Sequence, residues 1–200
     1  MSKIPPSSRP FIVQTGEPVL RSCAQEVPLE QIATPEFQAL IAKMISTMRE
    51  ASGVGLAAPQ IGVPLQILVL EDRDALMSSL SPEELAERER VPVETKVFIN
   101  PVLTPVGDET VTFFEGCLSV SGFAALVERW REVEVTGLDE HAMPHTWRVK
   151  GWPARILQHE VDHLNGTLYI DRMKTRTFTS PDRVEGGLVL AGLKKSLGIE

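Results

Sequence analysis

The chain has 200 residues, enough for one domain built around a single hydrophobic core. Hydrophobic residues make up 42% and charged residues 24%, the ordinary balance of a soluble globular protein, and no apolar run approaches the roughly 20 residues that a bilayer-spanning helix needs. The net charge of −7 argues against nucleic acid as a direct partner, because phosphate binding normally needs a basic face.

The first predicted element is a helix that follows an irregular stretch over residues 1–33. Thr34 and Pro35 form a typical helix start, an N-cap residue followed by proline at the first helical position. Apolar residues then recur at steps of three and four, which predicts an amphipathic helix packed on the core, and the glycines at 53 and 55 end the pattern. The apolar stripe consists of Phe37, Leu40, Ile41, Met44, Ile45 and Met48.

A strand is predicted over residues 66–70, and the segment that follows it, 71–94, differs in composition. This segment is rich in charged residues and contains a capping-box helix start at Ser81, so we expect a surface insertion with a short exposed helix. Further strand-like segments are bounded by Pro, Gly, Asp and Glu residues. They cover residues 96–100, 110–114, 124–130, 133–138 and 146–149.

A second helix is predicted from Pro153 to about residue 165, where Gly166 stops it. A possible last helix in the tail ends at residue 197. Because strands precede the helix without βαβ alternation, the order of elements predicts an α+β fold, with antiparallel β-sheets packed around a central helix. We expect one catalytic domain over residues 1–200, made up of a core at about 10–178, the insertion at 71–94 and a tail at 179–200.

The predicted central helix carries an H-E-x-x-H motif, in which Glu160 follows His159 and precedes His163. Positions i and i+4 share one helix face, so both imidazoles can reach a single ion. A metal ion lowers the pKa of a bound water toward about 7, and the intervening carboxylate can accept that water's proton without binding the metal. The motif therefore predicts a single-metal hydrolase, and we expect a structural role for the neighbouring Asp162.

A catalytic site of this kind needs a third protein ligand. The histidines His141 and His145 lie in a turn-like stretch, where we expect surface loop residues. The better candidate is Cys117, at the end of an apolar strand beside Gly116, because a thiolate binds Fe(II), Zn(II), Co(II) or Ni(II) strongly. From the residues alone, a small buried cysteine without a metal stays an alternative. Cys23 has no partner in this scheme.

Three motifs resemble those of the peptide deformylase family and occur in that family's order. They are GVGLAAPQ at residues 53–60, EGCLS at 115–119 and QHEVDHLNG at 158–166. The resemblance covers roughly residues 10–178 and is closer to the plant and mitochondrial branch. It implies an amide hydrolase that removes the formyl group from the N-terminal formylmethionine of nascent proteins and releases formate.

The resemblance also implies one divalent metal ion, with Fe(II) as the usual physiological metal and Zn(II), Ni(II) or Co(II) possible in isolated protein. The implied metal ligands are Cys117, His159 and His163. Glu160 is implied as the general base and acid. The oxyanion would accept hydrogen bonds from the side-chain amide of Gln60 and from the backbone N–H of Leu118, two donors typically worth a few kcal/mol each.

Substrate contacts are expected on two sides of this centre. The segment from Gly53 to Gln60, here called the glycine loop, lets a peptide approach the backbone because glycine has no side chain. We therefore expect the substrate to add as a strand beside Val54 and Gly55. Candidates for the apolar wall of a methionine pocket are Phe113, Trp152 and Ile156, although each could equally be ordinary core.

Two alternative functions stay open at this point, a metallopeptidase and a metal-containing protein that binds peptide N-termini without turnover. The partners expected for a deformylase are formyl-Met nascent peptides near the ribosome exit, with no nucleic acid or membrane bound. Residues 1–10 contain neither an apolar h-region nor an amphipathic presequence, so a bacterial cytoplasmic location is expected, with an organelle as the alternative if a transit peptide was removed.

Overall fold

The structure is a computed structural model and describes residues 11–180. Its helices are α1 (Leu29–Ile32), α2 (Pro35–Glu50), α3 (Pro82–Glu87), α4 (Trp152–Leu164) and α5 (Tyr169–Arg172). Short 3-10 turns lie at η1 (Pro18–Arg21), η2 (Ala58–Ile61), η3 (Asp74–Leu76) and η4 (Thr175–Thr177). No helix within the described range is long and apolar enough to cross a membrane.

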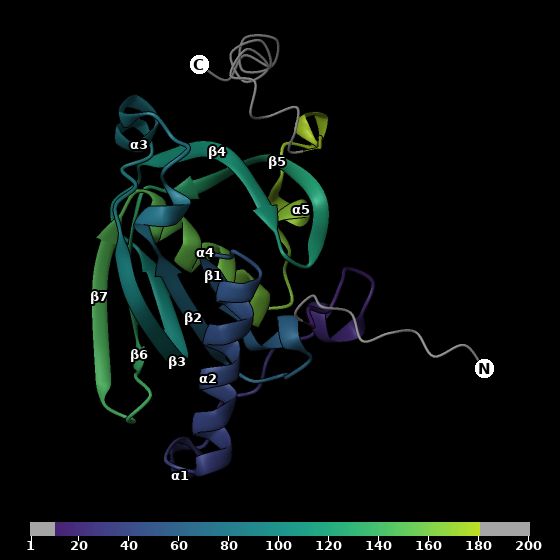
Figure 1. Ribbon diagram of the computed structural model, residues 1–200, viewed down its shortest axis with the longest axis vertical. Coiled ribbons are helices and arrows are strands. Elements are labelled where there is room, and N and C mark those ends of the chain that lie inside the picture. The colour runs from purple at the N-terminus through teal and green to yellow at the C-terminus, as the bar shows by residue number, and fades with distance from the viewer. Residues whose placement is uncertain (1–10, 181–200) are drawn as a thin grey trace, which may run out of the picture.

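The strands form two antiparallel sheets, as expected for an α+β fold. The five-stranded sheet has the order β1-β2-β3-β6-β7. Its strands are β1 (Gly55–Ala57), β2 (Ile67–Asp72), β3 (Val93–Pro105), β6 (Glu132–Leu138) and β7 (Pro144–Lys150). A separate two-stranded sheet pairs β4 (Thr110–Cys117) with β5 (Val120–Trp130). Helix α4 lies between the two sheets (Figure 1).

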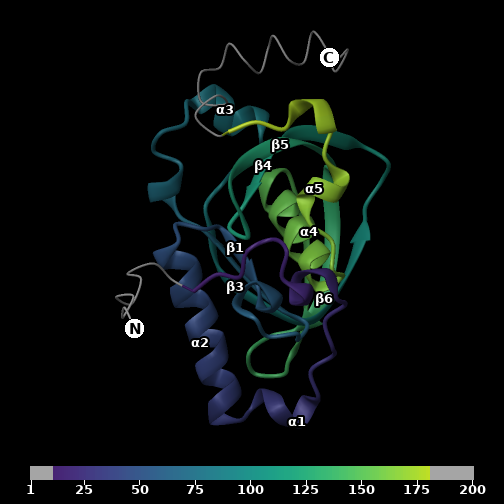
Figure 2. The same cartoon turned by 90° about the vertical axis from the view of Figure 1, so that its right-hand side faces the viewer.

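Strand β2, the second strand of the larger sheet, explains why helices cover both faces of that sheet. Successive strand residues point to opposite faces. Accordingly, Ile67 and Val69 pack in the cluster that contains the buried side of α2, whereas Leu68 and Leu70 pack in the cluster that contains α4. All four are fully buried, and each such side chain typically stabilises the fold by about 1.5–3 kcal/mol. Figure 2 shows α4 in the middle of this arrangement and α2 outside it.

Helix α2 confirms the periodicity argument from the sequence. Its N-cap, Thr34, accepts a hydrogen bond from the backbone N–H of Phe37 at 3.3 Å, and Pro35 is the first helical residue. The buried stripe residues pack on the sheet, and the chain turns after Glu50 toward β1. The loop after α2 therefore lies at the edge strand β1, which packs against α4.

The segment between β2 and β3 contains the exposed helix expected of a surface insertion, but the segment's two ends are buried. Strand β2 continues to Asp72, two residues beyond the predicted 66–70, because its backbone pairing with β3 extends to Asp72 opposite Val93. The buried Asp72 carboxylate accepts hydrogen bonds from two of the guanidinium nitrogens of Arg90, at 2.8 and 2.9 Å. Further along, the backbone carbonyl of Arg88 accepts a hydrogen bond from Trp152 N–H at 2.9 Å. The segment therefore docks against the start of α4, while α3 within it has the predicted Ser81 capping box.

Most other element bounds differ from the predictions only at their ends. Strands β3, β4 and β5 are longer than the apolar runs that predicted them, since backbone pairing continues beyond the hydrophobic residues. Two short helical turns, η1 and α1, lie in the stretch expected to be irregular with a few turns. The possible last helix ending at residue 197 lies outside the described residues, and the single-domain organisation over 1–200 stays a prediction.

Candidate metal centre and active site

Two elements bring the three predicted ligands together. Cys117 is the last residue of β4, and His159 and His163 lie one turn apart on α4. Their ligand atoms all lie within 4.8 Å of one another, and the Cys117 Sγ is 3.2 Å from His163 Nε2. Burial and neighbouring positive charge lower the pKa of His163, which favours the neutral imidazole that binds metal. One thiolate and two imidazoles fit a borderline divalent ion.

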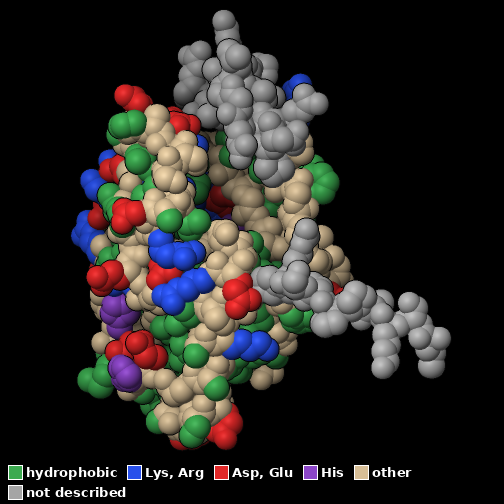
Figure 3. Space-filling model, in the orientation of Figure 1, with side chains coloured by type: hydrophobic (Ala, Val, Ile, Leu, Met, Phe, Trp, Pro, Cys, Tyr) green, Lys and Arg blue, Asp and Glu red, His purple; other side chains and the backbone are tan. Residues whose placement is uncertain are grey.

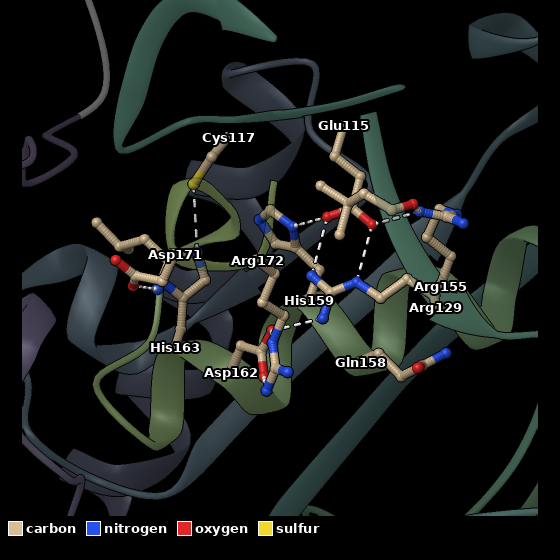
Figure 4. Close-up of polar contacts among 12 residues, drawn as sticks. Glu115, Cys117, Arg129, Arg155, Gln158, His159, Asp162, His163, Asp171 and Arg172 are labelled. Carbon is tan, nitrogen blue, oxygen red and sulfur yellow. Dashed lines mark hydrogen bonds and ion pairs between the residues drawn. The ribbon is translucent and has the colours of Figure 1, made fainter. Parts of the chain in front are cut away.

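A buried carboxylate, Glu115, orients the first of these histidines. Its Oε2 lies 2.9 Å from His159 Nδ1, which leaves Nε2 of the ring to face the ligand cluster. Arg129 donates two hydrogen bonds to the same carboxylate at 2.9 Å, and Arg155 donates another at 2.6 Å (Figure 4). Burial alone would raise the pKa of Glu115, but the hydrogen bonds from His159 and Arg129 outweigh it and hold the pKa well below its usual range.

The carboxylate of Asp162 continues this network away from the ligands. It accepts a hydrogen bond from Arg129 at 2.5 Å and two from Arg172 at 2.6 and 2.7 Å. Its partners are thus arginines rather than an imidazole, in line with the structural role expected from the sequence. Arg129 bridges Asp162 to Glu115, so the interior of the molecule beside α4 contains alternating positive and negative charges that neutralise one another.

Glu160 lies in the wall of the cavity beside the ligand cluster. It is buried, and its Oε2 atom has no hydrogen-bond partner among the described residues. Burial raises the pKa of this carboxyl to about 7. The close approach of Gly55 makes room for it: a Cβ on that glycine would lie 2.4 Å from Glu160 Oε1. A carboxyl with a near-neutral pKa and a free oxygen is suited to proton transfer.

Gln60 lies beside the Cys117 thiol. Its Oε1 accepts a hydrogen bond from the Ala57 N–H at 2.8 Å, which points the amide nitrogen toward the site. That Nε2 lies 3.3 Å from Ser119 Oγ and 3.7 Å from Cys117 Sγ. Leu118 occupies the turn between β4 and β5 and lines the same cavity. Both predicted oxyanion donors therefore lie beside the predicted ligand Cys117.

A cavity of about 340 Å³ opens on this centre. Its lining includes Val54, Gly55, Trp152 and Ile156, all predicted as substrate contacts. The visible face of the molecule is hollowed between its two sheets (Figure 3), with acidic and basic side chains mixed around the hollow. The position and apolar lining of the cavity suit a peptide whose first side chain is hydrophobic.

Phe113 is placed differently from its predicted position in the pocket wall. It is not among the residues that line the cavity, whereas its neighbour Phe114 is. Phe113 instead contacts the edge of Trp152, with ring centroids 6.4 Å apart, and lies under the guanidinium of Arg155. Adjacent residues of a strand face opposite ways, so only one of the two phenylalanines can face the cavity directly.

Sequence reasoning missed the residues that hold the ligands in place. The EGCLS motif contains Glu115 but indicates no role for it, and none of the three motifs contains Arg129 or Arg155. The available signal was the presence of charged residues within otherwise apolar segments, since buried charges must be paired. His141 lies exposed in the β6–β7 turn, as predicted. His145, by contrast, belongs to strand β7 rather than to a surface loop, and it stacks on the buried Phe98 with ring centroids 4.6 Å apart.

The fold and the site define a class, a hydrolase with a candidate mononuclear metal centre. A family model described as polypeptide deformylase matches residues 10–178. The chain therefore belongs to the polypeptide deformylase family, whose members are metal-dependent enzymes.

Individual relatives agree with this assignment. The chain is 50% identical over 190 residues to peptide deformylase 1A, chloroplastic, of Solanum lycopersicum, a match that covers 95% of this chain and 68% of that protein. It is 45% identical over 177 residues to the mitochondrial peptide deformylase of Homo sapiens, covering 88% and 73% respectively. The Met-Ala-Ser-bound crystal structure of class I type b peptide deformylase from Acinetobacter baumannii matches with a TM-score of 0.72 and 31% identity, over 81% of this chain and 96% of that one.

Replacing the candidate thiolate ligand tests the composition of the centre. We expect Cys117→Ser to lower the amount of metal that co-purifies with the protein, or to change which metal is retained, because a serine hydroxyl is a harder and weaker ligand. Metal content measured by elemental analysis, alongside the same measurement on Cys23→Ser, checks this. Cys23 is exposed, so its substitution is the matched control. Equal metal content and activity in wild type and Cys117→Ser would contradict the ligand assignment.

Proposed function

We propose that the cavity beside Cys117 and α4 is the site at which this peptide deformylase removes the N-terminal formyl group from formylmethionyl peptides of nascent proteins. The reaction consumes water and yields formate and a free amine. The observation that carries the proposal is the convergence of the Cys117, His159 and His163 ligand atoms within 4.8 Å, beside the buried and partly unpartnered carboxylate of Glu160.

In the proposed mechanism, side chains and backbone groups of the protein orient the reacting groups and transfer the protons. The thiolate and the two imidazoles would hold a divalent ion, which would supply Lewis acidity when bound. Glu160 accepts a proton from the attacking water and later delivers it to the leaving nitrogen. The amide of Gln60 and the backbone N–H of Leu118 donate hydrogen bonds to the oxyanion of the tetrahedral intermediate. Glu115 keeps the His159 ring in the orientation that ligation requires.

The metal we propose is Fe(II). A set of one thiolate and two imidazoles accepts Fe(II), Zn(II), Ni(II) and Co(II), so the ligand atoms alone do not select one of these four metals. Fe(II) comes from the family resemblance, and Zn(II), Ni(II) or Co(II) are the metals expected to replace it in isolated protein. Metal analysis after anaerobic purification, with activity measured on the same sample, tests this proposal.

The substrate is proposed to bind as an added strand beside Val54 and Gly55, with its methionine side chain between Trp152 and Ile156. The Acinetobacter baumannii relative has been crystallised with Met-Ala-Ser bound, a peptide that also begins with methionine. We further propose that the partners are nascent chains near the ribosome exit. The proposed location is the bacterial cytoplasm, with an organelle as the alternative that the chloroplastic and mitochondrial names of two relatives support.

Formate release under anaerobic conditions tests the function. The iron-loaded protein should release formate from formyl-Met-Ala and should leave unblocked Met-Ala-Ser intact. Cleavage of the unblocked peptide without formate release would identify a metallopeptidase instead. Tight binding of formyl-Met-Ala without turnover would identify a protein that binds peptide N-termini.

A further inference from the structure

A short segment near the start of the described chain links two parts of the candidate site. Residues 13–15, here called the strap, run between the η2 turn and the turn that joins β4 to β5. The backbone N–H of Val13 donates to the carbonyl of Gln60 at 2.8 Å. The backbone N–H of Thr15 donates to the carbonyl of Ser119, also at 2.8 Å. The strap therefore connects the element that contributes Gln60 with the turn that contributes Leu118, two segments far apart in the sequence.

The side chain of Gln14 adds a third link between the strap and the β4–β5 turn. Its Nε2 donates to the carbonyl oxygen of Leu118 at 3.0 Å and to the carbonyl oxygen of Ile12 at 3.2 Å. Ser121 Oγ donates to Gln14 Oε1 at 2.9 Å and lies 3.2 Å from the same Leu118 carbonyl. Because both the nitrogen and the oxygen of the Gln14 amide have partners, the amide has a defined orientation against the turn.

These contacts fix the peptide unit between Leu118 and Ser119. A peptide unit is planar, so holding its carbonyl oxygen also sets the direction of its N–H. That N–H, on Ser119, points at Cys117 Sγ at 3.4 Å. The N–H of Leu118 lies in the adjoining peptide unit. On the other side of the strap, Gln60 is held through its own carbonyl, and its Nε2 lies 3.3 Å from Ser119 Oγ. The strap thus holds both proposed oxyanion donors, Gln60 and Leu118, next to each other.

The strap is itself anchored in the core. Val13 is buried and packs in a cluster with Val120 and Val127 of β5. Gln14 and Thr15, in contrast, are exposed, and no strap residue is among those that line the cavity. A change at Gln14 therefore alters the contact with Leu118 without creating a void in the core and without removing a wall of the cavity.

We propose that the strap, through Gln14, positions the two oxyanion donors relative to each other. This inference rests on the proposed function, in which Gln60 and Leu118 donate to one oxygen. Donors that stabilise a developing charge must be in place beforehand, and a misplacement of about 1 Å can cost about 10²-fold in rate. The two donors belong to different elements, and the strap bonds to both of these elements. Gln14 is a positioning residue, since it acts through Leu118.

The variant Gln14→Met tests this role, because methionine has nearly the length of glutamine but cannot replace its hydrogen bonds. With iron-loaded protein and formyl-Met-Ala-Ser, we expect kcat per bound metal to fall about threefold to thirtyfold, less than the loss of 10²- to 10³-fold typical of removing an oxyanion donor outright. KM and metal affinity should stay unchanged. Inhibition by unblocked Met-Ala-Ser should also stay unchanged, because this peptide has no formyl group. Ser121→Ala should lower kcat in the same direction.

The matched control is Gln25→Met. Gln25 is also an exposed glutamine of the N-terminal stretch, but its backbone bonds to Pro64 and Gln66 rather than to the β4–β5 turn, so kcat should equal that of wild type. Unchanged kcat in both Gln14→Met and Ser121→Ala would overturn the positioning role while leaving the deformylase function intact. Weaker metal binding with unchanged kcat per bound metal would overturn it too, since the strap would then act on Cys117 through the Ser119 N–H. A wild type that releases no formate would overturn the proposed function itself.

Discussion

Glu160→Gln should lower kcat/KM for formyl-peptide hydrolysis by about 10²- to 10⁴-fold, the usual contribution of a positioned general acid–base, while leaving the metal content unchanged. Glutamine has nearly the shape of glutamate and cannot accept the water's proton. Because Glu160 contributes no atom to the predicted ligand set, the ion should remain bound. Formate release and metal analysis on the same preparations measure both effects, and Glu160→Ala should behave alike.

The control is Glu128→Gln, which neutralises an exposed carboxylate of β5 that pairs with Lys174, at 3.6 Å. It should retain wild-type activity. A Glu160→Gln enzyme with near wild-type turnover would show that another group handles the proton. Loss of metal together with activity would instead assign Glu160 a role in ligation.

The same substitution has an expected effect on stability whose sign follows from the pKa. Burial raises the pKa of Glu160 from 4.5 to about 7, so its favourable contribution to folding is complete below pH 4.5 and is lost as the pH rises through 7. Above that pH, keeping a buried carboxylate costs up to about 3 kcal/mol. In metal-free protein at pH 8, Glu160→Gln should therefore be more stable than wild type in urea unfolding, and this gain should vanish near pH 5.

The parts of the fold that the sequence predicts well are those with a local period. The apolar stripe of α2 recurs every three to four residues, and four of its six residues are buried while Leu40 and Ile45 are partly buried. The polar Thr47, which the apolar pattern leaves out, is buried as well. The metal ligands on α4 follow from the same geometry, since residues four apart share a helix face. Cys117 required the family resemblance, because nothing in its local sequence separates a ligand from a small buried residue.

Other features depend on contacts between distant segments and carry no local signal. Three segments of the chain contribute Glu115, Arg129 and Arg155, and only the pairing of β4 with β5 and the packing of α4 bring them together. The identity of the phenylalanine that faces the cavity depends on strand parity, so an error of one residue exchanges Phe113 for Phe114. The charged residues of 71–94 are predicted from composition to be exposed to solvent. Composition does not reveal the buried pairing of Asp72 with Arg90, because that pairing depends on the folded structure.

Glu115→Gln should be the most destabilising single substitution near the site. Its carboxylate accepts hydrogen bonds from Arg129 and Arg155 and lies 2.9 Å from His159 Nδ1, and all of these side chains are largely buried. Removing the negative charge takes the Glu115 counter-ion from the buried Arg155 and leaves Arg129 with Asp162. Breaking a buried pair in this way typically costs about 3–5 kcal/mol, which urea unfolding at pH 7 would measure.

The pH dependence of this loss follows from the lowered pKa of Glu115. A carboxyl whose pKa is depressed in the folded state contributes stability that is complete above its unfolded value, 4.5, and is lost as the pH falls toward the folded value. The difference between wild type and Glu115→Gln should therefore be largest at neutral pH and should shrink below about pH 4.5. A difference independent of pH would point to packing rather than charge.

Glu115→Gln should also weaken metal binding by about 10- to 100-fold, the usual effect of removing a partner that orients a ligating histidine. Competition with a metal chelator measures this affinity in variants that remain folded at pH 7. Glu109→Gln is the matched control, because Glu109 also pairs with an arginine, Arg131 at 2.7 Å, but its side chain is 62% exposed. It should change neither stability nor metal affinity appreciably, since exposed ion pairs contribute little. If Glu115→Gln lost stability but kept wild-type metal affinity, its carboxylate would support the fold without orienting His159.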